Sequence, residues 1–202
     1  MKAVGLLSGG LDSTVAMRLM LDQGIEVFAF NHVSMFCCCT PKESSCSAAR
    51  TAVNQLGIDL KVVNSTDEFL PIVEDPRHGY GSRMNPCLDC RIMMFRKARE
   101  YMEEIGASFV VTGEVLGQRP MSQRRDAMRL IDRESGLTGY VVRPLSAGLL
   151  EPTIPEKEGW IDREKLLRVS GRSRRPQMAL AEAMGLRDYP CPAGGCLLTD
   201  PI

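Results

Sequence analysis

The chain has 202 residues, of which 44% are hydrophobic and 25% are charged, so it has the length and composition of one globular domain with a core. Lysine and arginine together number 25, as do aspartate and glutamate. The resulting net charge of zero excludes a protein that binds nucleic acid through a high overall positive charge alone. Eight cysteines are too few and too unevenly spaced for a small disulfide scaffold.

The N-terminal apolar run is too short for a secretory signal, because it stops at Ser8 and the next apolar stretch carries Arg18. No stretch reaches the roughly 18 uncharged apolar residues of a membrane span. We therefore expect a cytoplasmic protein without a membrane partner. In that compartment, clustered cysteines indicate metal or sulfur chemistry more often than disulfides.

Short apolar runs alternate with helical periodicity along the first half of the chain. Strands are predicted at residues 2–7, 25–30, 58–63 and 107–112, and helices at residues 11–23, 46–56 and 87–105. A loop is predicted over residues 75–86, followed later by short helices at 162–169 and 177–184. This alternation predicts an α/β fold, a doubly wound and mostly parallel sheet with a small C-terminal helical extension. We expect a nucleotide-binding domain over residues 1–150 and a basic extension over residues 151–202 that carries Cys196.

The segment after the first predicted strand reads Ser-Gly-Gly-Leu-Asp-Ser, at residues 8–13. Its glycines let the backbone approach an anion, and the helix that follows offers unpaired N–H groups and a positive dipole end. Hydroxyl donors come from Ser8, Ser13 and Thr14, and Asp12 is predicted to hold Mg²⁺ against the phosphates. The alternative is a glycine turn in which Asp12 or Ser13 only caps the helix. The Gly-Lys-Ser/Thr ending of a Walker loop is lacking, which disfavours γ-phosphate transfer.

This hexapeptide resembles the signature of the PP-loop pyrophosphatases, which cleave ATP between the α- and β-phosphates, adenylate a substrate oxygen and let a nucleophile displace AMP. Val-Thr-Gly-Glu-Val-Leu-Gly-Gln at residues 111–118, Met-Ser-Gln at 121–123 and Arg-Pro-Leu at 143–145 are similar to the PP-loop domain of tRNA 4-thiouridine synthetases. Asn-Pro-Cys at residues 85–87, with Cys90, resembles a region of tRNA 2-thiouridylases. The resemblance covers most of the chain, but the RNA-binding domains and rhodanese tail of 4-thiouridine synthetases have no counterpart in these residues.

The resemblance implies an ATP-dependent sulfur transferase that adenylates a uridine carbonyl in tRNA and replaces its oxygen with sulfur. The predicted ATP contacts are Ser8, Gly9, Gly10, Asp12, Ser13, Thr14 and Gly113. Stabilising charge near the α-phosphate is assigned to Arg119 or Arg143. Two alternatives stay open: a PP-loop enzyme that thiolates or amidates a small metabolite, and a nucleotide-binding redox or metal module without catalysis.

Cys87 and Cys90 open a predicted helix, so their sulfurs lie one turn apart on one face, with Arg91 adding positive charge nearby. A CxxC pair by itself fits redox chemistry, zinc or an iron–sulfur cluster. Cys196 supplies a third sulfur and resembles the second catalytic cysteine of thiouridylases. The resemblance to cluster-dependent thiouridylases implies a [4Fe–4S] cluster on these three cysteines, with one open iron. Together with Asp12 they are the predicted catalytic residues, while a persulfide-carrying pair and structural zinc stay open as alternatives.

The remaining cysteines have no assigned role. Cys191 competes with Cys196 as a ligand. The cysteines at residues 37–39 are consecutive and Cys46 follows, but adjacent side chains point in different directions, which disfavours a shared ion. A second metal site, a sulfur relay and a cysteine-rich substrate loop without required chemistry are all open interpretations.

Basic residues gather in two stretches. Residues 163–187 hold seven basic and two acidic residues, a local charge of +5, and residues 119–133 hold five basic and two acidic residues, a local charge of +3. The predicted RNA contacts are Arg172, Arg174, Arg175, Arg124 and Arg125. A solvated charged face is the alternative. The expected cofactors are ATP, Mg²⁺ and the [4Fe–4S] cluster. The expected partners are tRNA, a sulfur donor (inorganic sulfide or a persulfide carrier protein) and, as an option, a second copy of the chain.

Overall fold

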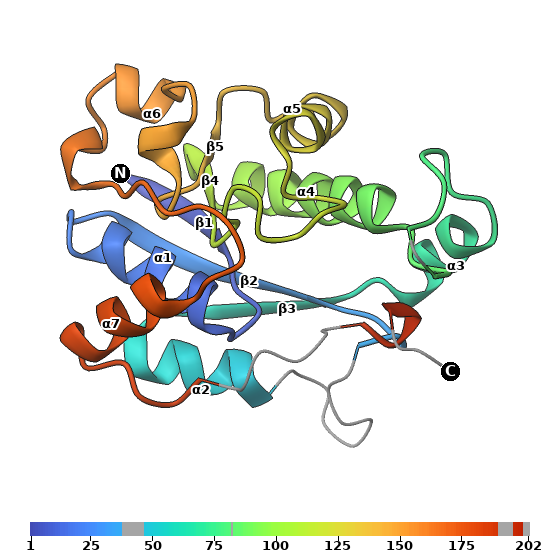
Figure 1. Cartoon of the computed structure of the whole chain (residues 1–202), viewed down its shortest axis with the longest axis horizontal. Helices are drawn as coiled ribbons and strands as arrows, with labels where there is room; N and C mark the ends of the chain where they lie inside the picture. The colour runs from blue at the N-terminus through green and yellow to red at the C-terminus, as the bar shows by residue number, and fades with distance from the viewer. Residues whose placement is uncertain (38–46, 82, 190–195, 200–202) are drawn as a thin grey trace.

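A computed structural model describes residues 1–37, 47–81, 83–189 and 196–199 of the chain. One sheet of five parallel strands runs in the order β3-β2-β1-β4-β5 (Figure 1). The strands are β1 Lys2–Leu6, β2 Glu26–Val33, β3 Leu60–Asn64, β4 Phe109–Thr112 and β5 Val141–Val142. Because β1 lies between β2 and β4, the winding reverses beside β1, and ligands of such sheets bind outside the carboxyl ends of the strands at this point.

Helices cover both faces of the sheet, as the sequence predicts (Figure 1). One face carries α1 Leu11–Leu21, α2 Ser47–Leu56 and α7 Arg175–Ala183, and the other carries α4 Cys87–Glu104 and α5 Arg125–Glu134. The remaining elements are α3 Thr66–Glu74, α6 Ile154–Lys157 and the 3-10 turns η1 Ala147–Leu149, η2 Arg163–Lys165 and η3 Leu197–Thr199. Within the described ranges, no helix is long and apolar enough to cross a membrane.

The core lies in two layers because successive strand residues point to opposite faces. In β1, Ala3 packs with α1 and α7, whereas Val4 packs with α4 and α5. Neighbouring strands repeat this division, with Val111 in the first layer and Val110 in the second. A parallel sheet buried on both faces needs nearly continuous apolar strands. The predicted doubly wound α/β fold is therefore confirmed.

Four helices and strands are absent from the sequence prediction, namely α3, α5, α6 and β5. Helix α3 contains Pro71, which normally marks a helix boundary, and β5 has only two residues. Helix α5 is rich in charge and buries only a narrow face.

The helix predicted over residues 162–169 is wrong, because only η2 forms there. The backbone N–H groups of Leu167 and Val169 donate instead to the carbonyls of Pro144 and Leu145. The helix predicted over residues 177–184 is present as α7, which begins at Arg175 with Pro176 in its first turn.

Residues after 150 pack on the same core as the sheet. Ile161, Leu166 and Ala181 are buried in the layer that contains Val15 of α1 and Val111 of β4. The predicted division of the chain at residue 150 stays a prediction.

Candidate active site

The loop between β1 and α1 presents an open first helical turn at the carboxyl edge of the sheet. Gly9 has a φ of 75°, and a Cβ built on it would lie 2.2 Å from the backbone of Ala48 in α2. A Cβ on Gly10 would meet only Ser8 Oγ, at 3.5 Å. Packing against α2 thus requires a glycine at position 9. Gly10, in contrast, leaves space at the N-terminus of α1, where an anion is favoured.

The alternative in which Asp12 or Ser13 caps α1 is wrong. The N-cap residue is Gly10, and no side chain makes the capping hydrogen bond. Ser13 Oγ and Thr14 Oγ1 donate to the Gly10 carbonyl at 2.9 and 3.0 Å, and Ser8 Oγ lies 3.3 Å from Ser13 Oγ. These hydroxyls therefore stabilise the loop through hydrogen bonds, and their predicted contacts with ATP stay predictions.

Asp12 is held by residues that are distant in sequence. Gln118 Nε2 donates to Asp12 Oδ2 at 2.9 Å, and Arg174 Nη2 lies 3.8 Å from the same oxygen. The other oxygen, Oδ1, is buried and has no hydrogen-bond partner among the described residues. An unsatisfied carboxylate oxygen beside a phosphate-type loop fits the predicted Mg²⁺ ligand, because Mg²⁺ takes one or two carboxylates together with phosphate oxygens.

The Thr-Gly-Glu motif after β4 packs directly on α1. A Cβ on Gly113 would lie 2.4 Å from the backbone nitrogen of Ser13, so only glycine fits at this contact. The absence of a side chain at Gly113 is thus required by packing between β4 and the phosphate-type loop, and its predicted contact with ATP stays a prediction.

Glu114, the next residue, lies in a buried ion network. Its carboxylate accepts from Arg143 Nε at 2.9 Å and lies 3.3 Å from Arg91 Nη2. Arg143 also donates to both oxygens of Asp132, at 2.7 and 2.9 Å. Burial disfavours the charge on Arg143, but Glu114 and Asp132 outweigh it, so the pKa of Arg143 is raised.

The predicted role of Arg143 at the α-phosphate is therefore wrong, because both sides of its guanidinium are occupied inside the protein. Arg119 keeps that prediction. Desolvation and the charge of Arg91 lower the pKa of Arg119, and the charges of Cys87 and Asp12 oppose this. The charge of Arg119 thus interacts with both the phosphate-type loop and the first cysteine of the CxxC pair.

The Asn-Pro-Cys segment places the first two cysteines at the N-terminus of α4. The buried Asn85 donates from Nδ2 to Cys87 Sγ at 3.4 Å and receives the N–H of Arg83 at 3.3 Å. Asp89, between the two cysteines, accepts the backbone N–H of His78 at 2.9 Å and lies 2.7 Å from its Nδ1. The long loop before α4 is therefore tied to the first turn that carries Cys87.

Four cysteines gather at the carboxyl edge of the sheet. Burial raises the pKa of Cys90 to about 12, Arg91 opposes this, and the charges of Cys196, Cys87 and Cys37 raise it further. Cys196 reaches this position through an antiparallel bridge with Cys37. The structure thus brings the three predicted cysteines together and adds Cys37. Cys38, Cys39, Cys46 and Cys191 lie outside the described residues.

Among the residues that the structure describes, no group of three or more Cys, His, Asp or Glu is arranged to hold a single metal ion. The zinc alternative stays open, because Cys38, Cys39, Cys46 and Cys191 lie outside the described residues. A cluster is held through separate irons, so its cysteine sulfurs do not need to converge on one point. Cys87, Cys90 and Cys196, called the cysteine trio below, lie close enough for their charges to act on Cys90, and the cluster stays a prediction.

The comparison with protein families decides what kind of protein this is. The profile of the family described as thiamine biosynthesis protein (ThiI) matches residues 1–149. The chain belongs to the ThiI family. The matched range includes the phosphate-type loop, the CxxC pair and the Thr-Gly-Glu motif. The predicted resemblance to the PP-loop domain of tRNA thiolation enzymes is therefore confirmed.

Curated relatives of this ThiI-family chain include a probable tRNA sulfurtransferase of Thermococcus kodakarensis, 33% identical over 153 residues that make up 71% of the chain and 36% of the relative. A tRNA-specific 2-thiouridylase MnmA of Listeria monocytogenes is 28% identical over 154 residues, 72% of the chain and 41% of the relative. The chain thus spans about two fifths of the length of these curated relatives.

A solved 4-thiouridine synthetase–RNA complex with bound ATP matches 92% of this ThiI-family chain and 51% of its own, with a TM-score of 0.53 and 24% identity. This match shows that the two proteins share a fold.

In this ThiI-family chain, the predicted RNA-binding arginines have different surroundings. Arg174 turns toward Asp12, whereas Arg172 and Arg175 are exposed. Arg124 is exposed and pairs with Asp126, and Arg125 donates to a backbone carbonyl at 2.9 Å. Sequence reasoning missed the contacts of Gln118 and Arg174 with Asp12, because nothing in their local pattern names a partner so distant in the chain.

Proposed function

We propose that the chain is the catalytic part of an ATP-dependent tRNA sulfur transferase, which adenylates a uridine carbonyl and replaces its oxygen with sulfur. One observation carries the proposal: Arg119 interacts electrostatically with Asp12 of the phosphate-type loop and with Cys87 of the cysteine trio. A nucleotide site and a sulfur site thus both lie close enough to one cation to interact with its charge. This is the arrangement that adenylation followed by sulfur attack requires.

On the nucleotide side, the open space at Gly10 and the first turn of α1 accept the pyrophosphate part of ATP. Asp12 Oδ1 would hold Mg²⁺, which would screen the phosphate charges. Arg174, 3.8 Å from Asp12 Oδ2, neutralises charge on the departing pyrophosphate. Arg119 stabilises the charge that develops at the α-phosphate when the uridine oxygen attacks.

On the sulfur side, the cysteine trio supplies the ligands of a [4Fe–4S] cluster. When bound, that cluster would offer an open iron for inorganic sulfide. Asn85 orients Cys87 Sγ, and Arg91, tethered to Glu114, keeps positive charge beside Cys90. A persulfide on the trio, delivered by a carrier protein, is the second route by which sulfur would reach the activated carbon.

The RNA contacts are Arg172 and Arg175, supported at the rim by Arg124 and Arg125. The segment that carries Arg172 is held beside the loop after β4, because Gly171 N–H donates to the Leu116 carbonyl at 2.8 Å. Exposed arginines at the edge of the nucleotide site suit the phosphates of a bound RNA.

The proposal is tested by ATP–pyrophosphate exchange with the purified chain, in the presence and absence of bulk tRNA. Stimulation of exchange by tRNA supports it, and Asp12→Asn abolishes that exchange. Equal exchange without RNA would favour an enzyme that acts on a small metabolite, and no exchange under either condition would favour a module without catalysis.

A further inference from the structure

Cys37 and Cys196 lie opposite each other in an isolated antiparallel bridge. The Leu197 N–H donates to the Phe36 carbonyl at 2.8 Å. In an antiparallel ladder, a hydrogen bond between these neighbours means that Cys37 and Cys196 form a non-hydrogen-bonded pair, whose own N–H and C=O groups are not bonded to each other. In such pairs the Cα atoms lie about 4.5 Å apart and the side chains are closer than elsewhere in a ladder. A disulfide spans Cα separations of roughly 4.4 to 6.8 Å. The register therefore places the two cysteines within disulfide range.

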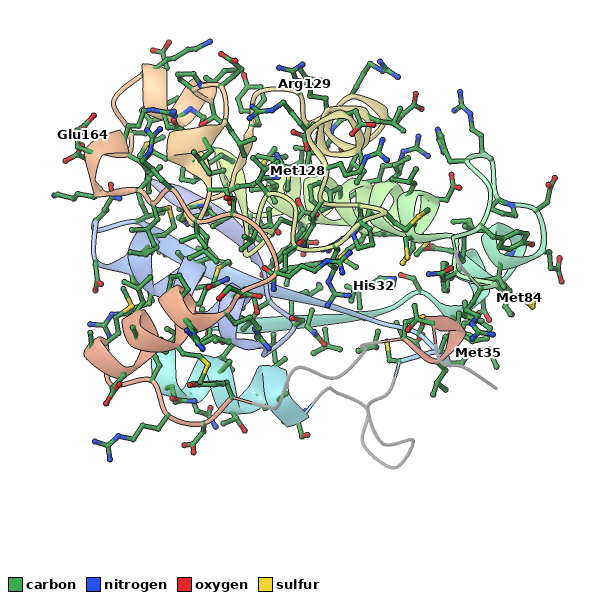
Figure 2. All side chains as sticks on the ribbon, viewed as in Figure 1. His32, Met35, Met84, Met128, Arg129 and Glu164 are labelled. Atoms are coloured by element: carbon green, nitrogen blue, oxygen red, sulfur yellow. The ribbon has the colours of Figure 1, made fainter. Side chains whose placement is uncertain are left out.

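Apolar packing holds this bridge in place. Phe36, next to Cys37, and Leu198, two residues after Cys196, both pack on a small cluster that contains Phe69 of α3 and Met93 of α4. The rings of Phe36 and Phe69 meet edge to face with their centroids 5.8 Å apart. Figure 2 shows Met35 beside η3, in agreement with this pairing. The bridge is thus anchored on both strands by buried contacts.

The sulfur of Cys37 is oriented from its own side of the bridge. The backbone N–H of Ser34 donates to Cys37 Sγ at 3.2 Å, and the Ser34 hydroxyl lies 3.9 Å from the same sulfur. The structure shows no disulfide among the four described cysteines.

We propose that Cys37 and Cys196 form a redox modification site, which a low-molecular-weight disulfide such as oxidised glutathione converts to a Cys37–Cys196 disulfide. Its consequence rests on the proposed function: the disulfide removes Cys196 from the cysteine trio. Cys37, which no sequence pattern explains, is then the residue that switches the sulfur site off.

The reaction is a two-step exchange. The Cys37 thiolate attacks one sulfur of oxidised glutathione, forms a mixed disulfide and releases one glutathione thiolate. The Cys196 thiolate then attacks the Cys37 sulfur and releases the second glutathione thiolate. Two cysteine thiols are oxidised, one external disulfide is reduced to two thiols, and the two cysteine protons pass to the glutathione thiolates through water.

In the oxidised state only Cys87 and Cys90 of the trio remain as thiols. Two sulfurs one helical turn apart lack the third ligand that the proposed cluster needs, and a sulfur already bonded to Cys37 cannot carry a persulfide. Excess thiol reverses the exchange and restores the trio. An oxidised cell would thus stop tRNA thiolation at the sulfur site and leave the nucleotide site intact.

The disulfide itself is tested on the purified full chain. Reduced protein is desalted, treated with oxidised glutathione, blocked with N-ethylmaleimide, digested with trypsin and analysed by mass spectrometry. Cleavage after Arg18, Lys42 and Arg187 places Cys37 in peptide 19–42 and Cys196 in peptide 188–202. We expect a cross-link between these peptides that persists in the matched controls Cys38→Ser and Cys191→Ser and is absent in Cys37→Ser and Cys196→Ser. A cross-link that survives Cys37→Ser, or no cross-link in wild type, overturns the proposal.

The consequence is tested by anaerobic loading with iron and sulfide, after which iron and the surviving cross-linked fraction are both measured. Iron per chain should fall in proportion to that fraction in wild type, at least fivefold when cross-linking is complete, with no fall in oxidised Cys37→Ser. Loss of iron binding by reduced, folded Cys37→Ser would show that Cys37 is a ligand and would overturn the switch; Cys37→Ala repeats the measurement with a second side chain. A wild type that cross-links but binds no iron when reduced would retain the disulfide and refute the proposed cluster instead.

Discussion

The contact between Arg174 and Asp12 changes the role that sequence alone predicts for this arginine. It is one of three arginines in a Gly-Arg-Ser-Arg-Arg segment, yet its Nη2 lies 3.8 Å from Asp12 and its Nε is buried without a hydrogen-bond partner among the described residues. A buried donor beside a phosphate-type loop is costly unless a ligand satisfies it. Arg172 and Arg175, by contrast, point to solvent.

We predict that Arg174→Ala raises the KM for ATP in pyrophosphate exchange by about 10- to 100-fold, the equivalent of about 1.5–3 kcal/mol for a hydrogen bond to a charged group. The adjacent Arg175→Ala serves as the matched control and should leave that KM unchanged. If Arg174→Ala affects only RNA binding, to the same extent as Arg175→Ala, then Arg174 is an RNA contact as its sequence pattern indicates.

His32, at the carboxyl end of β2, lies between the sheet and α4 (Figure 2). Burial lowers the pKa of His32 below 6.5; Glu68 opposes this, and Arg91 and Lys97 lower the pKa further. Its Nε2 is buried without a hydrogen-bond partner in the described part of the chain. The folded protein thus binds this proton less readily than the unfolded chain does.

The free energy of unfolding should therefore fall as the pH drops below 6.5, by up to about 1 kcal/mol at pH 5.5 from this group. The sign follows because the unfolded state holds more protons in this window. Urea unfolding of wild type and His32→Gln at pH 5.5 and 7.5 measures it, and the variant should lose less stability between the two values. Equal losses in both proteins would contradict the shift.

At the scale of elements, two glycines at the same loop have different physical reasons. Gly113 is required where β4 packs on α1, since its Cβ would lie 2.4 Å from the Ser13 backbone. Gly10 has no such neighbour, because a Cβ there would meet only Ser8 Oγ, at 3.5 Å. Both glycines belong to predicted ATP contacts, and sequence alone cannot separate their roles.

We expect Gly113→Ala to lower the free energy of unfolding by about 1–3 kcal/mol, because the protein must shift backbone to admit the methyl group. Gly10→Ala should leave stability within about 0.5 kcal/mol of wild type and weaken ATP binding at least tenfold. Denaturant unfolding and ATP titration of the two variants provide the comparison. A Gly10→Ala variant that binds ATP normally would place the phosphates elsewhere.

Much of the element order could be predicted because strands buried on both faces carry nearly continuous apolar runs. The elements that escaped prediction lack that signal. Helix α3 contains Pro71, α5 is mostly charged, and β5 forms from two residues whose pairing with Val110 and Val111 depends on the finished sheet. The helix predicted over residues 162–169 failed because its backbone donors found carbonyl partners at Pro144 and Leu145.

Over the whole molecule, the neutral net charge conceals an uneven distribution of basic residues. The loop after β4 and the segment that carries Arg172 are joined by the hydrogen bond from Gly171 to Leu116, so two basic stretches meet beside the nucleotide site. Lys2 is the exposed first residue of β1 and lies at the amino edge of the sheet, opposite the carboxyl edge that carries the nucleotide site. It is therefore a control for positive charge at a distance.

We predict that the double variant Arg172→Glu and Arg175→Glu weakens tRNA binding at least tenfold and reduces the slope of log affinity against log salt by roughly 1 to 2, one phosphate contact for each arginine. Lys2→Glu should change neither quantity. Fluorescence anisotropy between 50 and 200 mM salt measures both. An unaltered slope in the double variant would mean that these arginines form only a solvated face.

The sequence by itself determined the α/β fold, the phosphate-type loop after the first strand and the CxxC pair at the start of a helix. These features are local, since each depends on residue types a few positions apart. Only the tertiary structure decided that Arg143 is sealed in an ion network, that Arg174 faces Asp12, and that Cys37 stands opposite Cys196. Gln118 and Asp12 are 106 positions apart, and such contacts arise from how the packed sheet brings its carboxyl ends together, which no local pattern encodes.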